Sequence, residues 1–204
     1  TDELIKNLND INIKIESNCD TEVYIAHYGI TSIQNIRGMY SLCFYNKKTK
    51  IIIATRDQLG IKPLYYKYSS KKIIISSEAL VFDKDLINQQ AFESYMVFGY
   101  FPKEETLLED VHKFQPGEIH IINTQSFKVS KFFIQLDFKK NKISNINESI
   151  GNILESSIKE QLVADVPVGI FLSGGIDSSI IAYHTKKNIG KFNSYVSKYY
   201  GDDS

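Results

Sequence analysis

The sequence predicts two successive domains of different class: an antiparallel α+β domain, followed by the start of a parallel α/β domain. Three observations carry this prediction. Roughly the first 135 residues are rich in the apolar–polar alternation of half-buried strands. A polar stretch of Lys and Asn, Lys139–Asn147, indicates a linker. Beyond it come a helical pattern, an apolar strand, a glycine-containing loop and a second helix, the order that opens a parallel α/β unit.

In the first domain the pattern predicts two helices and a series of strands. One helix is expected from Asp20 to about Tyr28, with Asp20 or Thr21 as its cap, and another from Asn88 to Val97, before the breaker 99–102. Turns rich in Lys, Asn and Ser separate the strands. The expected strands are Met39–Tyr45, Ile51–Thr55, Leu64–Tyr68, Ile73–Ser77 and Ile119–Ile122.

In the second domain apolar residues recur at the helical period from Ile146 to Leu162, with Asn145 or Asn147 as the expected cap. Val168–Leu172 is apolar enough to be a strand buried on both faces. A helix whose apolar residues begin at Ile180 and which runs to about Asn188, and then a strand near Phe192–Val196, follow. Two strands cannot bury a parallel sheet, so this domain is expected to be incomplete and the chain to be an internal piece of a longer protein.

Composition excludes several functional classes. Lys plus Arg and Asp plus Glu both number 24, so no net charge attracts the chain to nucleic acid or to a membrane, and neither is an expected partner. No apolar run approaches the roughly 18 residues that a membrane helix needs. Cys19 and Cys43 lie far apart, without the spacing of metal ligands. These features fit a reducing, cytoplasmic setting.

The segment Ser173–Ser179, with the sequence SGGIDSS, carries the strongest functional signal. Two glycines expose backbone amides, the next helix favours negative charge at its start, and the three serine hydroxyls add donors for phosphate. The loop has no Lys, which the mononucleotide loop of kinases requires. Asp177 would repel phosphates unless a cation bridged them, so it predicts magnesium. The alternative is that Asp177 and Ser178 only cap the helix.

Following the apolar strand that ends at Leu172, this string resembles the pyrophosphate loop of the ATP-pyrophosphatase enzymes, which cleave ATP to AMP and pyrophosphate while adenylating a substrate. The resemblance implies a Rossmann-like parallel sheet with ATP and Mg²⁺ as cofactors. Asp177 would also hold the metal. The residues implied in binding ATP and pyrophosphate are the backbone of Phe171 with Ser173, Gly174, Gly175, Asp177, Ser178 and Ser179.

A second string, Arg56–Tyr66, has the sequence RDQLGIKPLYY. By itself it predicts a strand, a turn and another strand, in which Arg56 and Asp57 could pair and Gly60 could supply a positive φ. With its neighbours it resembles the glutaminase domain of glutamine-dependent asparagine synthetases. The further matching segments, in the family's order, are Ile36–Tyr40, Ser76–Leu80, Tyr95–Gly117 and Asp165–Gly169, so the resemblance spans almost the whole chain.

The resemblance implies that residues 1–138 are the C-terminal part of an N-terminal nucleophile glutaminase, an αββα sandwich of the type 2 glutamine amidotransferases. Residues 145–204 would be the N-terminal part of the synthetase domain. The implied reaction uses glutamine, aspartate and ATP and yields asparagine, glutamate, AMP and pyrophosphate, in a protein that could form a homodimer. Asp20 would hold the glutamine α-ammonium, unless it merely caps its helix.

The chain also departs from the family. It has no Cys at position 1, so no catalytic nucleophile is assigned, and the isolated chain is not expected to catalyse either half-reaction. The residues that select the acceptor would lie after Ser204 in this family. Two alternatives therefore stay open: a related amidotransferase acting on another carboxylate or closing a β-lactam ring, and a non-catalytic truncated copy.

Overall fold

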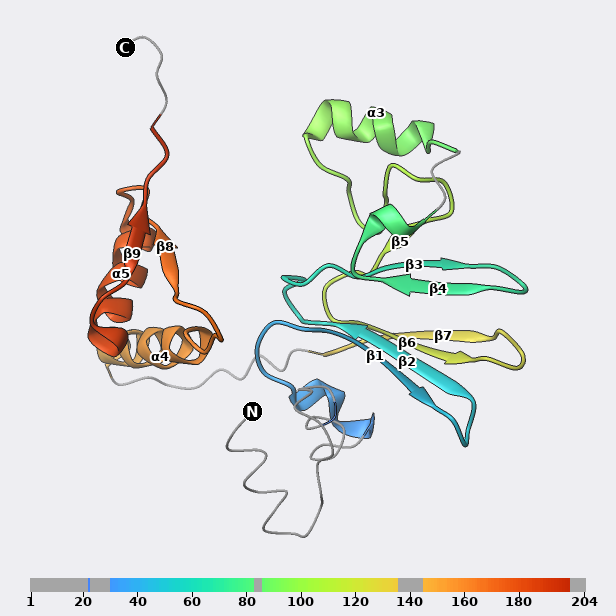
Figure 1. Ribbon diagram of the computed structural model, residues 1–204, viewed down its shortest axis with the longest axis horizontal. Helices are drawn as coiled ribbons and strands as arrows, with labels where there is room; N and C mark the ends of the chain where they lie inside the picture. Colours follow the sequence, from blue (N-terminus) through green and yellow to red (C-terminus); the bar gives the residue numbers. More distant parts are fainter. Residues whose placement is uncertain (1–21, 23–29, 83–85, 136–144, 199–204) are drawn as a thin grey trace. The chain divides into compact units, whose positions relative to one another are not determined.

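The computed structural model describes residues 22, 30–82, 86–135 and 145–198. The chain divides into two compact units, Thr1–Asp137 and Phe138–Ser204, each described here by itself (Figure 1). The helix expected from Asp20 to Tyr28 lies outside the described residues except for Glu22, which is helical. Most of the expected linker also lies outside them. Within the described residues, no helix combines the length and the apolar character needed to cross a membrane.

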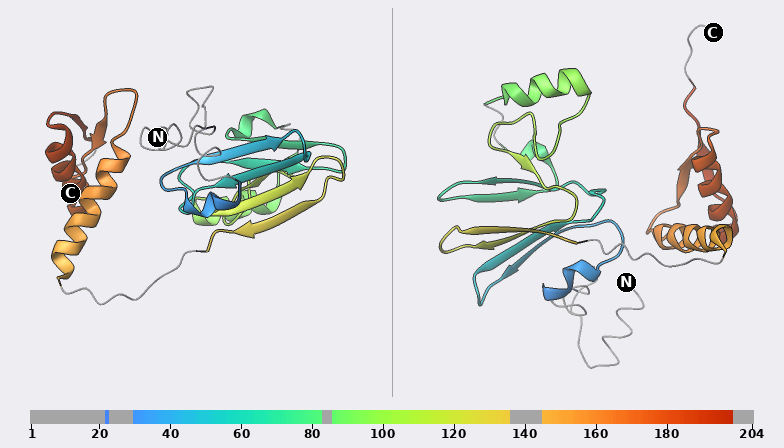
Figure 2. Two further views of the ribbon diagram at one scale, coloured as in Figure 1. Left: turned by 90° about the horizontal axis from the view of Figure 1, so that it is seen from below. Right: turned by 180° about the vertical axis from the view of Figure 1, so that it is seen from behind.

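The first unit is built on two antiparallel sheets that face each other (Figures 1 and 2). Helix α3 (Gln89–Phe98) lies on the outer side of one sheet and the 3-10 helix η1 (Ile30–Asn35) on the outer side of the other. The four-stranded sheet has the order β1 (Ser41–Asn46), β2 (Ile51–Arg56), β6 (Glu118–Asn123) and β7 (Val129–Phe133). The three-stranded sheet has the order β4 (Ile73–Ser76), β3 (Tyr65–Tyr68) and β5 (His112–Lys113).

Strand alternation divides the apolar residues of the four-stranded sheet between two layers. On the outer face, Leu42, Phe44 and Ile53 pack with Ile33 and Ile36 from the region of η1. Because neighbouring residues of a strand point to opposite faces, the next positions face the second sheet. The layer between the sheets is formed by Ala54, Leu64, Tyr66 and Phe114, with Tyr68 and Ile75 packed against them.

The second unit consists of α4 (Ile146–Gln161), β8 (Gly169–Phe171), α5 (Ile176–Ile189) and β9 (Asn193–Tyr195). Strands β8 and β9 pair in parallel, and α5 forms the connection between them. Asn145 is the N-cap of α4, because its Oδ1 accepts a hydrogen bond from the Glu148 amide at 3.3 Å. Lys187 Nζ on α5 contacts Glu155 Oε2 on α4 at 2.6 Å, which joins the two helices.

The predicted elements in the described residues are confirmed, with bounds that shift by one or two residues except at the start of α5. The 3-10 helix η1 was not predicted. The two-residue strand β5 and the edge strand β7 were not among the predicted strands, since neither has a clear run of alternation. Helix α5 begins at Ile176, four residues before the apolar periodicity starts at Ile180. Strand β8 is shorter than Val168–Leu172, because only Gly169–Phe171 pair with β9.

Candidate functional site

The candidate phosphate loop joins the end of β8 to the start of α5. Phe171, the last residue of β8, has an 83% exposed side chain, and its ring centroid lies 6.3 Å from that of Tyr195. The Leu172 amide donates to the Tyr195 carbonyl at 2.9 Å, which continues the strand pairing past Phe171. The backbone that enters the loop is therefore held by β9.

Both glycines of the loop have a defined conformational role. Gly174 has φ +81°, in the left-handed region that favours glycine, and no atom lies within 4 Å of where a Cβ would stand. Gly175 is the N-cap of α5, with φ −74° and ψ 166°. The main-chain amides of Ile176, Asp177 and Ser178 then belong to the first helical turn, where N–H groups lack an intrahelical acceptor. This arrangement is suited to an anion.

The three serine hydroxyls all make hydrogen bonds within the loop. Ser173 Oγ lies 3.1 Å from Ser178 Oγ, and the Ser178 and Ser179 hydroxyls donate to the Gly175 carbonyl at 3.1 and 2.7 Å. The sequence predicted these hydroxyls as donors to phosphate. In the structure these hydroxyls bond within the loop. To bind a phosphate, the serine side chains would have to rotate about χ1 and exchange these internal hydrogen bonds for bonds to the phosphate oxygens.

Asp177 lies in the first turn of α5 and is exposed. Because Gly175 is the N-cap and no side chain caps the helix, Asp177 and Ser178 are not N-cap residues, contrary to the alternative interpretation of the sequence. Within the described residues the Asp177 carboxylate makes no hydrogen bond or ion pair. No cluster of three or more potential metal-ligating acids, His or Cys occurs there either. A lone carboxylate still fits Mg²⁺, which commonly takes one or two carboxylates, with phosphate oxygens and water completing its shell.

The loop also borders an open hollow of about 380 Å³ that follows one face of α5. His184 lies two helical turns from the loop and is 9% exposed, and its Nδ1 has no hydrogen-bond partner among the described residues. The lining residues are Gly174, Ile176, Ser179, Ile180, Tyr183 and His184.

In the first unit, the Arg56–Tyr66 string forms a loop held by side-chain bonds to backbone. The Asp57 carboxylate accepts from the Leu59, Ile61 and Lys62 amides at 3.0–3.1 Å. The Arg56 guanidinium donates to the carbonyls of Gly60, Lys62 and Phe114. Both groups thus bind backbone and not each other, which corrects the suggestion that they pair. Gly60 has φ +66°, as predicted.

The pKa of Asp57 shows how these amides act. Burial by itself would raise the pKa of this carboxyl, but hydrogen bonds from the Ile61, Lys62 and Leu59 amides favour the ionised form and hold its pKa below the ordinary value. The loop therefore depends on a charged carboxylate at its centre. The folding of this loop is therefore enough to explain why Arg56 and Asp57 follow each other at the end of the strand, and no ligand is needed to explain them.

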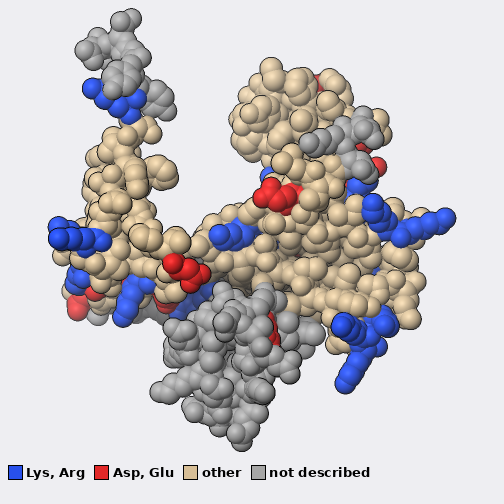
Figure 3. Space-filling view, viewed as in Figure 1, with Lys and Arg blue, Asp and Glu red and all other residues tan. Residues whose placement is uncertain are grey.

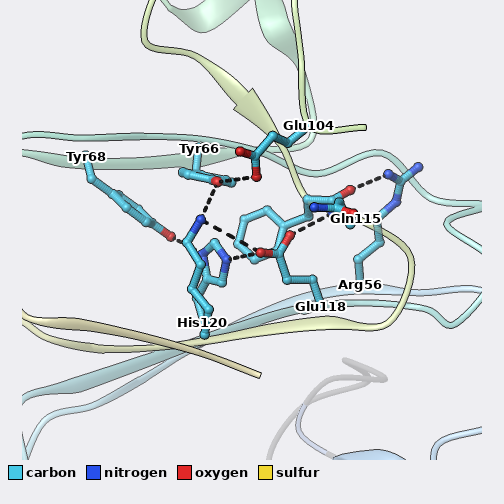
Figure 4. A network of polar contacts seen from close by, with 9 residues as sticks. Arg56, Tyr66, Tyr68, Glu104, Gln115, Glu118 and His120 are labelled. Carbon is cyan, nitrogen blue, oxygen red and sulfur yellow. Dashed lines mark hydrogen bonds and ion pairs between the residues drawn. The ribbon is translucent and has the colours of Figure 1, made fainter. Parts of the chain in front are cut away.

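Sequence reasoning missed a polar network between the two sheets (Figure 4). Tyr68 Oη lies 2.7 Å from His120 Nδ1, and His120 Nε2 lies 2.7 Å from Glu118 Oε1. The lowered pKa of Glu118 keeps its carboxylate an acceptor, so His120 Nε2–H donates to Oε1. In the neutral imidazole Nδ1 then accepts from the Tyr68 phenol, whose pKa is raised by burial. The available signal was the alternation in β6, which places Glu118 and His120 on the same face as buried Ile122.

A second branch of the network reaches the surface through Lys131. Its Nζ contacts Tyr66 Oη at 2.7 Å and lies 3.9 Å from Glu118 Oε1, and Glu104 Oε2 is 3.5 Å from Tyr66 Oη. Burial alone would raise the pKa of Glu118. The hydrogen bonds from His120 and from the Gln115 amide, with the nearby charge of Lys131, outweigh it and lower that pKa.

Among the predicted site residues, the structure brings together Ser173, Gly174, Gly175, Asp177, Ser178 and Ser179 in one loop, with Phe171 at the strand end before it. Asp20, the predicted glutamine ligand, lies outside the described residues. The buried network and the Arg56–Lys62 loop belong to the first unit. Their contacts are accounted for by folding of the first unit.

Comparison with known proteins assigns a family to each part of the chain. The family described as "Glutamine amidotransferase domain" matches residues 1–133, and the family described as "Asparagine synthase" matches residues 149–204. Asparagine synthetase [glutamine-hydrolyzing] 1 of Bacillus subtilis is 31% identical over 194 residues, which are 91% of this chain and 31% of that protein. The chain spans about a third of the length of the curated asparagine synthetase relatives from Bacillus subtilis and Methanocaldococcus jannaschii.

Two further similarities broaden the comparison. The amidase chry2 of Gibberella zeae is 30% identical over 192 residues, covering 83% of this chain and 27% of its own. A solved structure, glutamine phosphoribosylpyrophosphate amidotransferase from B. subtilis, aligns loosely, with a TM-score of 0.43 and 16% sequence identity. The alignment covers 96% of this chain and 42% of the amidotransferase chain. Residues 1–133 account for well over half of the sequence, and the second match covers residues that follow them in the chain. The chain therefore belongs to the glutamine amidotransferase domain family, in the arrangement of the glutamine-hydrolysing asparagine synthetases.

Proposed function

We propose that the natural protein containing this chain is a glutamine-hydrolysing asparagine synthetase that converts ATP, aspartate and glutamine to asparagine, glutamate, AMP and pyrophosphate. The observation that carries the proposal is the loop after β8. It combines a left-handed Gly174, a glycine N-cap and an exposed Asp177 that does not cap the helix and has no partner among the described residues. The order of the two family matches supports the same reaction.

In this proposal the first unit is the C-terminal part of an N-terminal nucleophile glutaminase, over residues 1–138. The second is the N-terminal part of a Rossmann-like ATP-pyrophosphatase domain, over residues 145–204. The parallel pair β8–β9 with its connecting α5, and the facing antiparallel sheets, support these assignments. Glutamine hydrolysis would use Asp20 to hold the substrate ammonium. A cytoplasmic homodimer completes the proposal.

The proposed chemistry assigns distinct tasks to the loop. The aspartate side-chain carboxylate attacks the α-phosphorus of ATP, the bond to the bridging oxygen breaks, and pyrophosphate leaves. Ammonia then attacks the acyl carbon, AMP leaves with the bonding electrons, and a proton is lost from nitrogen. The first-turn amides of α5 with the Ser173, Ser178 and Ser179 hydroxyls would bind the pyrophosphate. Asp177 would hold Mg²⁺, which supplies positive charge to the departing pyrophosphate.

Product analysis of the full-length natural protein tests this proposal. With aspartate, glutamine and ATP, the expected products include asparagine, and AMP in amounts equal to it. Ammonium salts should replace glutamine as nitrogen donor, which separates the two half-reactions. Release of ADP in place of AMP would contradict the pyrophosphatase assignment of the loop.

A second candidate function keeps the loop and changes the acceptor. It is favoured by the amidase chry2, whose similarity covers 83% of this chain although it is not named as an asparagine synthetase. In that case AMP would form with glutamine and ATP only when a carboxylate other than aspartate is supplied. A panel of amino-acid and sugar carboxylates, scored by AMP release, decides between the two acceptors.

A further inference from the structure

The chain has no net charge, but its charges are unevenly distributed. The segments 41–56, 64–77 and 119–135 carry no Asp or Glu. They contain five whole strands, β6 without its first residue Glu118, and the hairpin turns between these strands. The turns β1–β2, β3–β4 and β6–β7 all carry lysine. These turn lysines are Lys47, Lys48, Lys50, Lys71, Lys72 and Lys128, and together they are called here the lysine end.

The three turns lie at the same end of the first unit. The β6–β7 turn adjoins the β1–β2 turn, because the Thr124 amide and hydroxyl both donate to the Lys50 carbonyl at 2.9 Å. The β3–β4 hairpin of the other sheet extends in the same direction, and all three views of Figures 1 and 2 show the three tips together. In Figure 3 the blue side chains at the right-hand end lie over these turns.

The turn lysines also lack counter-charges among the residues that the structure describes. All six are exposed, and within the described residues they form no ion pair. The strand lysines of the same hairpins differ, since Lys67 lies 4.0 Å from Asp110 and Lys131 contacts the Tyr66 hydroxyl. The lysine end is therefore a positively charged surface on a chain without net charge, and the net charge alone does not reveal such a surface.

We propose that the lysine end binds an anionic lipid surface. Three neighbouring hairpin tips at one end of the sandwich can approach a plane together, and clusters of four to eight Lys or Arg residues are typical of such binding. Nucleic-acid sites favour Arg and exposed aromatic rings for stacking. The three turns contain no Arg, and Phe127, their single aromatic residue, is half-buried. These features favour lipid headgroups over nucleic acid.

The expected binding is weak and reversible, because charge alone supplies one signal where stable anchoring needs two. Each lysine close to an anionic surface strengthens binding by about fivefold. The attraction falls with ionic strength as the Debye length shortens, from about 14 Å at 50 mM salt to a few ångströms at 0.5 M. Zwitterionic lipid should give no binding under any of these conditions.

The test is sedimentation of the whole chain with phosphatidylcholine vesicles, with or without about one-third phosphatidylglycerol, at about 50 and 500 mM salt. The test variant is Lys48→Gln/Lys71→Gln/Lys72→Gln. The matched control removes the same charge elsewhere, as Lys159→Gln/Lys186→Gln/Lys191→Gln. All six substituted lysines are exposed, so folding should be retained, and circular dichroism checks this. A third variant, with Arg at positions 48, 71 and 72, keeps the charge.

The wild-type chain, the control and the Arg variant should bind phosphatidylglycerol vesicles at low salt, and about 0.5 M salt should release them. The Gln variant of the lysine end should bind about a hundredfold more weakly. Equal binding by both Gln variants, or no binding by the wild-type chain, would overturn the proposal. So would a higher affinity for a single-stranded oligonucleotide than for the vesicles at the same salt. Because no assay of synthesis is involved, the result is independent of the proposed ligase activity.

Discussion

His120 Nε2 lies 2.7 Å from Glu118 Oε1, and both side chains are almost completely enclosed between the two sheets. The other carboxylate oxygen, Oε2, accepts from the Gln115 amide at 2.8 Å. Each oxygen of Glu118 therefore satisfies a different buried donor. Through Tyr68 and His120 the same carboxylate links the three-stranded sheet to the four-stranded one.

Replacing Glu118 should destabilise the first unit in a graded way. Glu118→Gln keeps one oxygen and should cost about 1–2 kcal/mol, because an amide NH₂ then faces a buried donor or forces His120 to change tautomer. Glu118→Leu keeps the volume but leaves both donors without an acceptor, and should cost about 3–5 kcal/mol. Guanidinium unfolding, followed by tyrosine fluorescence since the chain has no Trp, measures both.

The exposed Glu78 provides the control for this series, because Glu78→Gln should change the free energy of unfolding by less than about 0.5 kcal/mol. If the role of Glu118 were packing alone, leucine would be tolerated better than glutamine. Observing that order would show that the hydrogen bonds to His120 and Gln115 contribute little.

Stability should fall as the pH is lowered into the acid range. The folded-state pKa values of Glu118 and Asp57 lie below their ordinary values of 4.5 and 3.8. When a carboxyl has a lower pKa in the folded state, the unfolded chain binds more protons than the folded one. The contribution of the two carboxylates to the free energy of unfolding is therefore complete at pH values above their ordinary pKa values. It is lost as the pH falls through their folded-state pKa values. Urea unfolding from pH 7 down to about pH 3 should show this loss. Glu118→Gln should have a shallower dependence below about pH 4.5, and a slope parallel to wild type would contradict the assignment.

Gly60→Ala should destabilise the Arg56–Lys62 loop. Gly60 has φ +66°, and a Cβ there would lie 3.1 Å from Arg56 Cζ and from Pro116 Cγ. The left-handed backbone alone costs a residue with a Cβ about 1–2 kcal/mol, and the two contacts add to this. Gly151→Ala is the control, because it lies in α4 with open space around it and should stabilise by roughly 0.5–1 kcal/mol. Equal thermal midpoints for wild type and Gly60→Ala would show that the loop relaxes.

Local sequence patterns were sufficient for much of this fold. The alternation of β1 to β4 and of β6 predicted those strands. Asn88, where the second helix was predicted to begin, is the N-cap of α3, and Asn145, one of the two expected caps, is the N-cap of α4. Helix α5 shows where such patterns fail. Its apolar period begins at Ile180, but the helix begins at Ile176, since Gly175 in an extended conformation allows the turn to start directly after the loop.

The candidate loop was also predictable, because its residues are contiguous in sequence. The buried network was not predictable in this way, because Tyr68 and His120 are 52 residues apart in the sequence. They meet only because their two sheets pack face to face. Glu118 and His120 could have been identified as buried polar residues from alternation. Their partners depend on sheet packing, for which a single sequence carries no local signal.

Asp177→Asn in the full-length natural protein should abolish AMP-forming synthesis and leave glutamine hydrolysis largely intact. Under the proposed function, the carboxylate would hold the metal whose charge stabilises the departing pyrophosphate, and an amide is a poor substitute for it. Folding should be little affected, because Gly175 and not Asp177 is the N-cap of α5. Losing one negative charge in the first turn costs only about 0.3–1 kcal/mol. Glu148→Gln, which removes the acid from the first turn of α4, is the matched control and should keep both activities. If Asp177→Asn formed asparagine and AMP at nearly the wild-type rate, the metal-binding role of Asp177 would be wrong.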